Sequence, residues 1–242
     1  MFRRSRSSDV IIALDFPSEE KAWAFLDHFK SLEGKPFVKV GMELFYAAGP
    51  EFVKKLKAEG YPVFLDLKLH DIPNTVAGAV NSLKGLGVDM LTLHASGGRE
   101  MFARAKEAIN DMEHPPILLG VTVLTSFSDE GRKEALLGEN HSVEETVEGL
   151  AKMALSAGCD GIVSSAMEGE YLRKTIGSSF PLVCPGIRPK GASAGDQKRV
   201  VTPEDARKIG VDFIVVGRPI TKADDPLSAY SVIRRDFLGG NE

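Results

Sequence analysis

The sequence predicts an α/β fold, namely a single-domain (β/α)8 TIM barrel. Eight short apolar, β-rich runs recur along the chain, and stretches that begin with helix-start signals separate them. The length of 242 residues is close to the roughly 250 that such a barrel takes. No linker or break in composition divides the chain, so we expect one domain.

The predicted strands are mostly apolar on both faces, as strands covered by helices must be. A doubly wound open sheet is the alternative, and one that binds a dinucleotide would carry a glycine fingerprint after its first strand. Here the first turn reads DFPSEE and contains no glycine. The eight runs are DVIIALDF (9–16), FVKVGM (37–42), VFLDLKL (63–69), MLTLHA (90–95), ILLGVTVLT (117–125), GIVSS (161–165), PLVCPGI (181–187) and FIVVGRP (213–219).

Helix starts are marked between these runs. Ser18 precedes two glutamates, which are favourable charges in a first helical turn. Ser142 and Glu145 have the spacing of a capping box. At 202–205 a threonine cap is followed by proline at the first helical position and by two acids.

The N-terminal segment, residues 1–8, is basic and lies outside the predicted barrel, which we place at 9–242. Only five apolar residues follow Asp9 before Asp15, too few for the core of a signal peptide, so we expect a solvated arm. No apolar run approaches the roughly 20 residues that cross a bilayer. Cys159 and Cys184 lie in apolar contexts and are interpreted as reduced thiols. These observations predict a cytoplasmic protein.

Composition is that of an ordinary globular protein, with 43% hydrophobic and 26% charged residues. The formal net charge of -4 gives no excess of positive charge for neutralising nucleic-acid phosphates. We therefore expect no nucleic acid and no membrane as partners, whereas a small anionic ligand needs only a local cluster of donors.

Charged residues collect at the carboxyl ends of the first three predicted strands, where barrels of this type have their active sites. Asp15 ends the first run, Lys39 lies in the second, and Asp66 and Lys68 lie in the third. Strand periodicity predicts that three leucines of run 63–69 take one face and that Asp66 and Lys68 take the other. Asp71 follows at the start of a predicted helix.

These charges have two interpretations. They could be surface ion pairs on an amphipathic strand, with Asp71 as a helix cap. We favour a functional cluster, because three adjacent strands bring charges to one rim, and buried charges are tolerated only when they are paired. The order Lys39, Asp66, Lys68, Asp71 alternates in sign, which would hold Lys68 protonated and fixed, as a general acid must be.

The later strands carry residues that suit a phosphate. Arg188 follows the seventh run, and Gly217 and Arg218 follow the eighth, where barrels commonly bind phosphate. Gln197 lies in a long loop, 185–201, which is either functional or a surface excursion. Thr125 and Ser126, at the end of the fifth run, are either hydrogen-bonding groups for a polar ring or turn caps.

We predict no metal site. His70 and His94 lack the clustered histidine or carboxylate partners of a metal site, so they are interpreted as hydrogen-bonded packing residues. Asp66 has no second dedicated ligand in the sequence.

The chain resembles the bacterial orotidine 5'-phosphate decarboxylase family from ALD near residue 13 to the final strand and helix. LDLKLHDIPNT is specific in combination with the other motifs, whereas Asp-x-Lys-x-x-Asp alone is shared by related barrels. The motifs that carry the resemblance are IIALDFP with Asp15, FVKVGME with Lys39, LDLKLHDIPNTV, HASGG, GVTVLTS, PGIRP, GDQKRVVTP and VVGRPI.

The resemblance implies decarboxylation of orotidine 5'-phosphate to UMP and CO2 in pyrimidine biosynthesis, without metal or cofactor. It implies Lys68 as the proton donor to C6 of the pyrimidine and Asp66 beside the leaving carboxylate. It also implies a homodimer in which Asp71, Ile72 and Thr75 reach the site of the other subunit. The other implied contacts are Asp15 and Lys39 to the ribose, Thr125 and Ser126 to the pyrimidine, and Arg188, Gln197, Gly217 and Arg218 on the phosphate side.

Two other functions remain open. A magnesium-dependent 3-keto-gulonate 6-phosphate decarboxylase or hexulose-phosphate synthase shares Asp-x-Lys-x-x-Asp, but it needs a metal-binding acid near the second strand, for which Glu43 is the weak candidate. The loop segment 191–198 counts against it. A non-catalytic phosphate-binding barrel is the other alternative, and it has no use for so costly a charge cluster.

Overall fold

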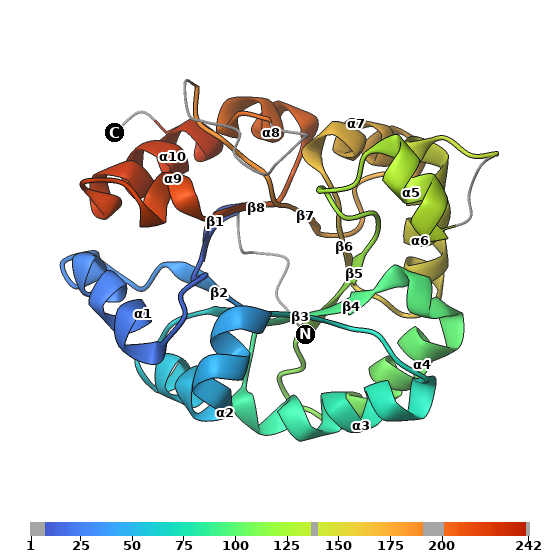
Figure 1. The fold of residues 1–242 in the computed structure, drawn as a ribbon, viewed down its shortest axis with the longest axis horizontal. Helices are drawn as coiled ribbons and strands as arrows, with labels where there is room; N and C mark the ends of the chain where they lie inside the picture. The colour runs from blue at the N-terminus through green and yellow to red at the C-terminus, as the bar shows by residue number, and fades with distance from the viewer. Residues whose placement is uncertain (1–7, 137–139, 191–200, 241–242) are drawn as a thin grey trace.

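The computed structural model describes residues 8–136, 140–190 and 201–240. In this part of the chain, eight parallel strands pair in sequence order and close into a barrel with helices around it (Figure 1). The predicted (β/α)8 barrel is therefore confirmed. The strands are β1 (Asp9–Ala13), β2 (Phe37–Gly41), β3 (Val63–Leu69), β4 (Met90–His94), β5 (Ile117–Val121), β6 (Gly161–Val163), β7 (Leu182–Cys184) and β8 (Phe213–Val216).

Most strand-to-strand connections contain one main helix, and some contain additional short ones. The α-helices are α1 (Glu19–Leu26), α2 (Met42–Ala58), α3 (Pro73–Leu83), α4 (Gly98–Ala108), α5 (Asp129–Leu136), α6 (Val143–Ser156), α7 (Ala166–Thr175), α8 (Pro203–Ile209), α9 (Arg218–Thr221) and α10 (Pro226–Leu238). The 3-10 turns are η1 (Asp27–Phe29), η2 (Lys84–Leu86) and η3 (Ala95–Gly97).

All three predicted helix starts are confirmed. Ser18 and Thr202 each accept a hydrogen bond from a backbone N–H in the first turn of α1 and α8. Ser142 and Glu145 form a full capping box at α6. Several strands, in contrast, end earlier than their apolar runs. β5 ends at Val121 rather than at residue 125, because its ladder with β6 stops there and the backbone turns into the loop.

The core has two layers, one inside the barrel and one between barrel and helices. On β1, Ile11 and Ala13 face the interior, while Val10 and Ile12 pack under the helices. This is why the strands lack polar alternation, since both faces are buried. The interior layer consists of Ile11, Ala13, Phe37, Phe64, Met90, Ile117, Leu119, Val121, Val163, Val183, Phe213 and Val215.

The barrel is closed by pairing between its first and last strands. Asp9 of β1 is in register with Phe213 of β8, and α10 packs against β1 and α8. Asp9 also accepts a hydrogen bond from Arg234 of α10 at 3.1 Å. The sequence 1–7, most of the predicted arm, lies outside the described residues. In the described ranges, every helix is too short or too polar to span a bilayer.

Candidate active site

An ion-paired cluster lies at the carboxyl ends of β2 and β3. The Lys39 ammonium is 3.0 Å from a carboxylate oxygen of Asp15 and 3.6 Å from one of Asp66. The other oxygen of Asp66 is 2.9 Å from the Lys68 ammonium. Parallel pairing explains the assembly, because Gly41 of β2 is in register with Asp66 of β3. Four of the predicted site residues thus form one array.

The predicted faces of 63–69 are confirmed, because Leu65, Leu67 and Leu69 pack in the layer under the helices while Asp66 and Lys68 lie on the other face. The backbone at Lys68, however, is not a regular strand. Lys68 has a φ of 49°, a left-handed conformation that costs a side-chain-bearing residue on the order of 1 kcal/mol. Leu65 pairs with Leu91 and Leu69 with Leu93, so β3 contains a bulge opposite β4. Bulges redirect side chains near active sites, and this one brings Lys68 onto Asp66.

Thr92 of β4 stabilises the bulge and was not predicted as a site residue. Its hydroxyl oxygen accepts a 2.8 Å hydrogen bond from the Lys68 N–H. The same hydroxyl donates to Asp66 at 3.0 Å. Thr92 is fully buried, so it ties the strained backbone and the carboxylate together in a site shielded from water. The sequence signal was a polar residue within the apolar run 90–95.

The environment of Asp66 favours its charged form. Burial alone raises the pKa of this carboxyl, but the Lys39 and Lys68 charges and the hydrogen bonds from Lys68 and Thr92 outweigh burial and lower it below its ordinary value. Asp66 is only 9% exposed. The structure thus holds a carboxylate between two ammonium groups in a low-dielectric setting.

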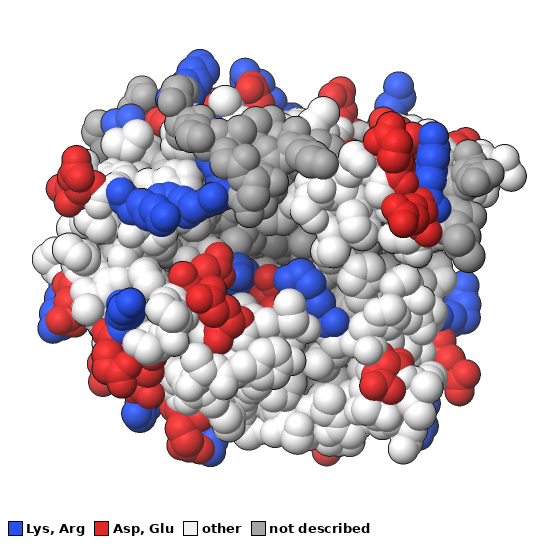
Figure 2. Space-filling model, in the orientation of Figure 1, with Lys and Arg blue, Asp and Glu red and all other residues white. Residues whose placement is uncertain are grey.

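A cavity of about 340 Å³ opens over this cluster, and Figure 2 shows basic and acidic side chains around a hollow near the centre of the molecular face. Its volume is within the range of small-molecule sites. Charged residues of β2 and β3 form one side, and hydroxyl residues after β5 and β6 form another. The cavity is lined by Lys39, Phe64, Asp66, Lys68, Val121, Val123, Leu124, Thr125, Ser126, Val163, Ser164, Pro185 and Val215.

The glycine at the end of β2, which was not predicted as a site residue, leaves room for the Lys39 ammonium. A Cβ at Gly41 would lie 2.9 Å from the Lys39 ammonium nitrogen and 3.4 Å from an oxygen of Asp15. A side chain here would therefore shift the end of the Lys39 side chain. At Gly217 a Cβ would lie 3.8 Å from Asp15, which puts the end of β8 beside the same cluster.

The predicted phosphate residues lie along the rim of β7 and β8. Arg188 is buried and donates to the Ile187 carbonyl at 2.8 Å, while Arg218 is exposed at the start of α9. Neither is among the described residues that line the cavity. The Arg188 N–H also donates to the Val201 carbonyl at 3.0 Å, joining the two ends of the long loop. Gln197 lies outside the described residues.

Asp71, Ile72 and Thr75 are not among the described residues that line the cavity of their own chain. All three are exposed, and Ile72 is 67% exposed, which is unusual for a large apolar side chain. Asp71 accepts a hydrogen bond from the Ile72 N–H at 2.6 Å. In the described part of the chain Asp71 makes no ion pair, so the expectation that it extends the array of alternating charges is wrong within one chain.

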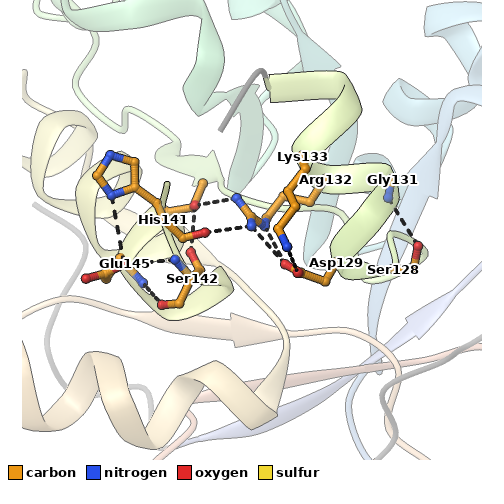
Figure 3. A network of polar contacts seen from close by, with 9 residues as sticks. Ser128, Asp129, Gly131, Arg132, Lys133, His141, Ser142 and Glu145 are labelled. Carbon is orange, nitrogen blue, oxygen red and sulfur yellow. Dashed lines mark hydrogen bonds and ion pairs between the residues drawn. The ribbon is translucent and has the colours of Figure 1, made fainter. Parts of the chain in front are cut away.

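A buried arginine, Arg132, connects α5 with the start of α6 (Figure 3). Arg132 is fully buried, donates to Asp129 at 2.8 and 3.1 Å, and donates to the His141 carbonyl at 2.7 Å. It also donates to Thr146 of α6 at 3.0 Å. α5 is thereby held against the start of α6.

The two histidines differ from one another. The ring of His94 is within hydrogen-bond distance of the Ser96 hydroxyl at 2.8 Å, in agreement with its predicted role. Burial, followed by the nearby His70 and Lys68, lowers the pKa of His94. His70 is exposed and stacks on His94 at 5.4 Å, so it is not a buried packing residue. Among the described residues, no three His, Cys, Asp or Glu side chains are grouped to hold a metal ion.

A cavity at the carboxyl ends of parallel barrel strands is where enzymes of the (β/α)8 class hold their substrates, and the chain has the fold and the site of that class. The family follows from sequence comparison. The chain belongs to the Orotidine 5'-phosphate decarboxylase / HUMPS family, whose model matches residues 8–233.

Individual relatives agree with the family. The chain is 49% identical to the orotidine 5'-phosphate decarboxylase of Streptococcus gordonii over 232 residues, covering 96% of this chain and 99% of that protein. It is 49% identical to the enzyme of that name from Idiomarina loihiensis, covering 93% and 95%. The crystal structure of orotidine 5'-phosphate decarboxylase from Lactobacillus acidophilus superposes with a TM-score of 0.83 at 43% identity, covering 95% and 99%.

Proposed function

We propose that this protein decarboxylates orotidine 5'-phosphate to UMP and CO2, with Lys68 as the proton donor. The observation that carries the proposal is the ion-paired array of Lys39, Asp66 and Lys68, of which the first two are buried, beside a cavity of about 340 Å³. The family and the names of its relatives support the substrate.

The chemistry needs a positive charge at the reacting carbon. The bond between C6 and its carboxylate breaks, CO2 leaves, and the electron pair stays on C6 in the plane of the ring. The ring π-system cannot delocalise an in-plane pair well, so electrostatic stabilisation must lower the barrier. An ammonium already fixed by Asp66 and by the bulge provides this without reorganisation, and then transfers its proton to C6.

The remaining residues would orient the nucleotide. Asp66 would lie beside the substrate carboxylate and disfavour its ground state, while Asp15 and Lys39 would bind the ribose hydroxyls. Arg188, Gly217 and Arg218 would lie on the phosphate side, where the loops after β7 and β8 meet. Binding energy from the phosphate, remote from the reacting carbon, can then favour the transition state rather than only tighten the substrate.

A homodimer with shared sites belongs to the same proposal. The exposed Asp71, Ile72 and Thr75 at the start of α3 support it, because an exposed apolar side chain suits an interface, as does a carboxylate that has no ion pair within the described ranges. Each would complete the site of the other subunit. We further propose that the enzyme acts in the cytoplasm.

The decisive test is whether EDTA-treated protein decarboxylates orotidine 5'-phosphate. The reaction is monitored as the loss of the substrate's absorbance. We expect full turnover without added metal and its loss in Lys68→Ala. Lys57→Ala is the matched control, because Lys57 is similarly exposed and pairs with Asp89 at 2.6 Å. Activity that returns only with magnesium would favour the 3-keto-gulonate 6-phosphate decarboxylase or hexulose-phosphate synthase function, although Glu43 is exposed on α2.

Shared sites are tested by mixing two inactive variants. Lys68→Ala and Asp71→Ala subunits, unfolded and refolded together, form mixed dimers in which one site has both residues. With random pairing, half of the dimers are mixed and half of their sites are intact, so activity should recover to about a quarter of the wild-type value per chain. A mixture as inactive as its components would refute the sharing of Asp71.

A further inference from the structure

Ser164 is a buried hydroxyl residue in the cavity wall, directly after β6. It is 2% exposed, and among the described residues its hydroxyl has no hydrogen-bond partner. A buried hydroxyl without a partner is destabilising, because it has lost its hydrogen bonds to water. Its position in the lining of the cavity suggests that a ligand supplies the missing partner.

Two backbone carbonyls beside Ser164 already accept hydrogen bonds from groups other than its hydroxyl. The Val163 carbonyl accepts two hydrogen bonds at 3.1 Å, one from the Thr122 N–H and one from the Thr122 hydroxyl, which occupies both of its lone pairs. The Val183 carbonyl accepts from the Ser164 N–H at 3.2 Å. A serine oxygen moves among three staggered positions by rotation about χ1, so an acceptor at the cavity wall can recruit the hydroxyl.

The position of Ser164 in the barrel indicates which part of a ligand its hydroxyl would contact. β6 is three strands from β3 around the closed sheet, and it neighbours β5, whose following loop carries Thr125 and Ser126. Three hydroxyl residues thus line the wall remote from the Asp66–Lys68 pair. The floor between these two walls is apolar, which suits the faces of a planar ring.

We propose that the Ser164 hydroxyl donates a hydrogen bond to a ring carbonyl of the pyrimidine, on the edge remote from the reacting carbon. Ser164 is therefore a binding residue that selects a carbonyl-bearing base. This inference depends on the proposed function, because it names a contact to the same substrate. Among the described residues the Ser164 hydroxyl has no partner, and the bound nucleotide would supply one.

The test compares two adjacent serines. Ser164→Ala removes an unpaired group, so its urea unfolding midpoint should stay equal to wild type or rise, while the Kd for UMP by calorimetry rises about five- to tenfold. Ser165 is equally buried but caps α7 by accepting from the Met167 N–H at 3.2 Å. Ser165→Ala should therefore lower the midpoint and leave the UMP Kd within twofold.

Thio analogues identify the contact. Sulfur accepts hydrogen bonds weakly, so 2-thiouridine or 4-thiouridine 5'-phosphate should bind wild type more weakly than UMP, and Ser164→Ala should shrink that penalty for one of them. Unchanged UMP affinity in Ser164→Ala, or equal analogue penalties in both proteins, would overturn the inference while leaving the decarboxylase proposal intact. Wild-type protein that neither binds UMP nor consumes orotidine 5'-phosphate would overturn both.

Discussion

Replacing Asp66 with asparagine isolates the contribution of one buried charge to stability. The side chain keeps its shape, and the oxygen or nitrogen of the amide can still contact Thr92. The change removes the anion between the Lys39 and Lys68 ammonium groups, which lie 3.6 and 2.9 Å from its oxygens. We expect a large loss of stability, because the Lys39 side chain is only 11% exposed and, among the described residues, its remaining ion-pair partner is the solvent-exposed Asp15.

The size of the loss follows from these distances. At an effective dielectric constant of about 20, each attraction is worth roughly 5 kcal/mol before desolvation. Desolvating the carboxylate opposes this by several kcal/mol, and the 29% exposure of Lys68 screens its share. Breaking a buried pair from one side typically costs about 3–5 kcal/mol. We therefore expect a decrease of about 3 kcal/mol in the free energy of unfolding at pH 7.

Urea unfolding at fixed protomer concentration measures the loss in the free energy of unfolding. Repeating the measurement at several pH values tests whether the Asp66 charge is the cause. The folded pKa of Asp66 is lowered, so its contribution is present above the unfolded value of about 4 and is lost as the pH falls through the folded pKa. The difference between wild type and Asp66→Asn should be constant near neutrality and shrink in acid. Asp15→Asn is the control, because its side chain is 58% exposed and should cost below about 1 kcal/mol. A loss below about 1 kcal/mol for Asp66→Asn, or a loss unchanged at pH 3, would refute the reasoning.

Two substitutions and one labelling measurement test other parts of the structure. Arg132→Ala should lower the free energy of unfolding by about 3 kcal/mol, measured in urea against Lys133→Ala, whose exposed side chain should contribute below about 1 kcal/mol. Gly41→Ala should reduce kcat/KM at least about tenfold by displacing Lys39. Gly149→Ala, where a Cβ meets open space, is the control that should be unaffected. Equal kcat/KM values for Gly41→Ala and wild type would contradict the proposed contact of Lys39 with the ribose. Burial raises the pKa of Cys159 to about 12, so about one thiol in ten thousand is ionised at pH 8. Labelling of Cys159 by a disulfide reagent should therefore require urea. Rapid labelling of the native protein would contradict the burial of this thiol.

The fold was predictable because its signals are local. Each strand is a short apolar run, and each of the predicted helix starts has a cap within three residues of its partner, as at Ser142 and Glu145. Such signals survive into the structure, since capping groups act within one turn. The ends of strands were less predictable. Whether β5 stops at Val121 depends on where β6 stops pairing with it, and that is a property of two segments far apart in sequence.

The site was predictable where residue type alone restricts the environment. Lys39, Asp66 and Lys68 are charges in apolar runs, and such charges must be paired. Thr92, Gly41 and Ser164 were missed for the opposite reason. A threonine or serine in a strand is compatible with packing, and a glycine at a strand end is compatible with a turn, so only the three-dimensional contacts separate these uses.

The bulge at Lys68 shows how residue type and three-dimensional contacts act together. A regular strand would place Asp66 and Lys68 on one face, but successive same-face residues point in parallel and project their charges side by side rather than toward each other. The left-handed turn at Lys68 changes the direction of that side chain, and Thr92 holds both the turned N–H and the carboxylate. Backbone strain of this kind persists only where surrounding contacts enforce it. The ammonium is therefore fixed by the fold before any substrate arrives, which is the condition that electrostatic stabilisation of a carbanion requires.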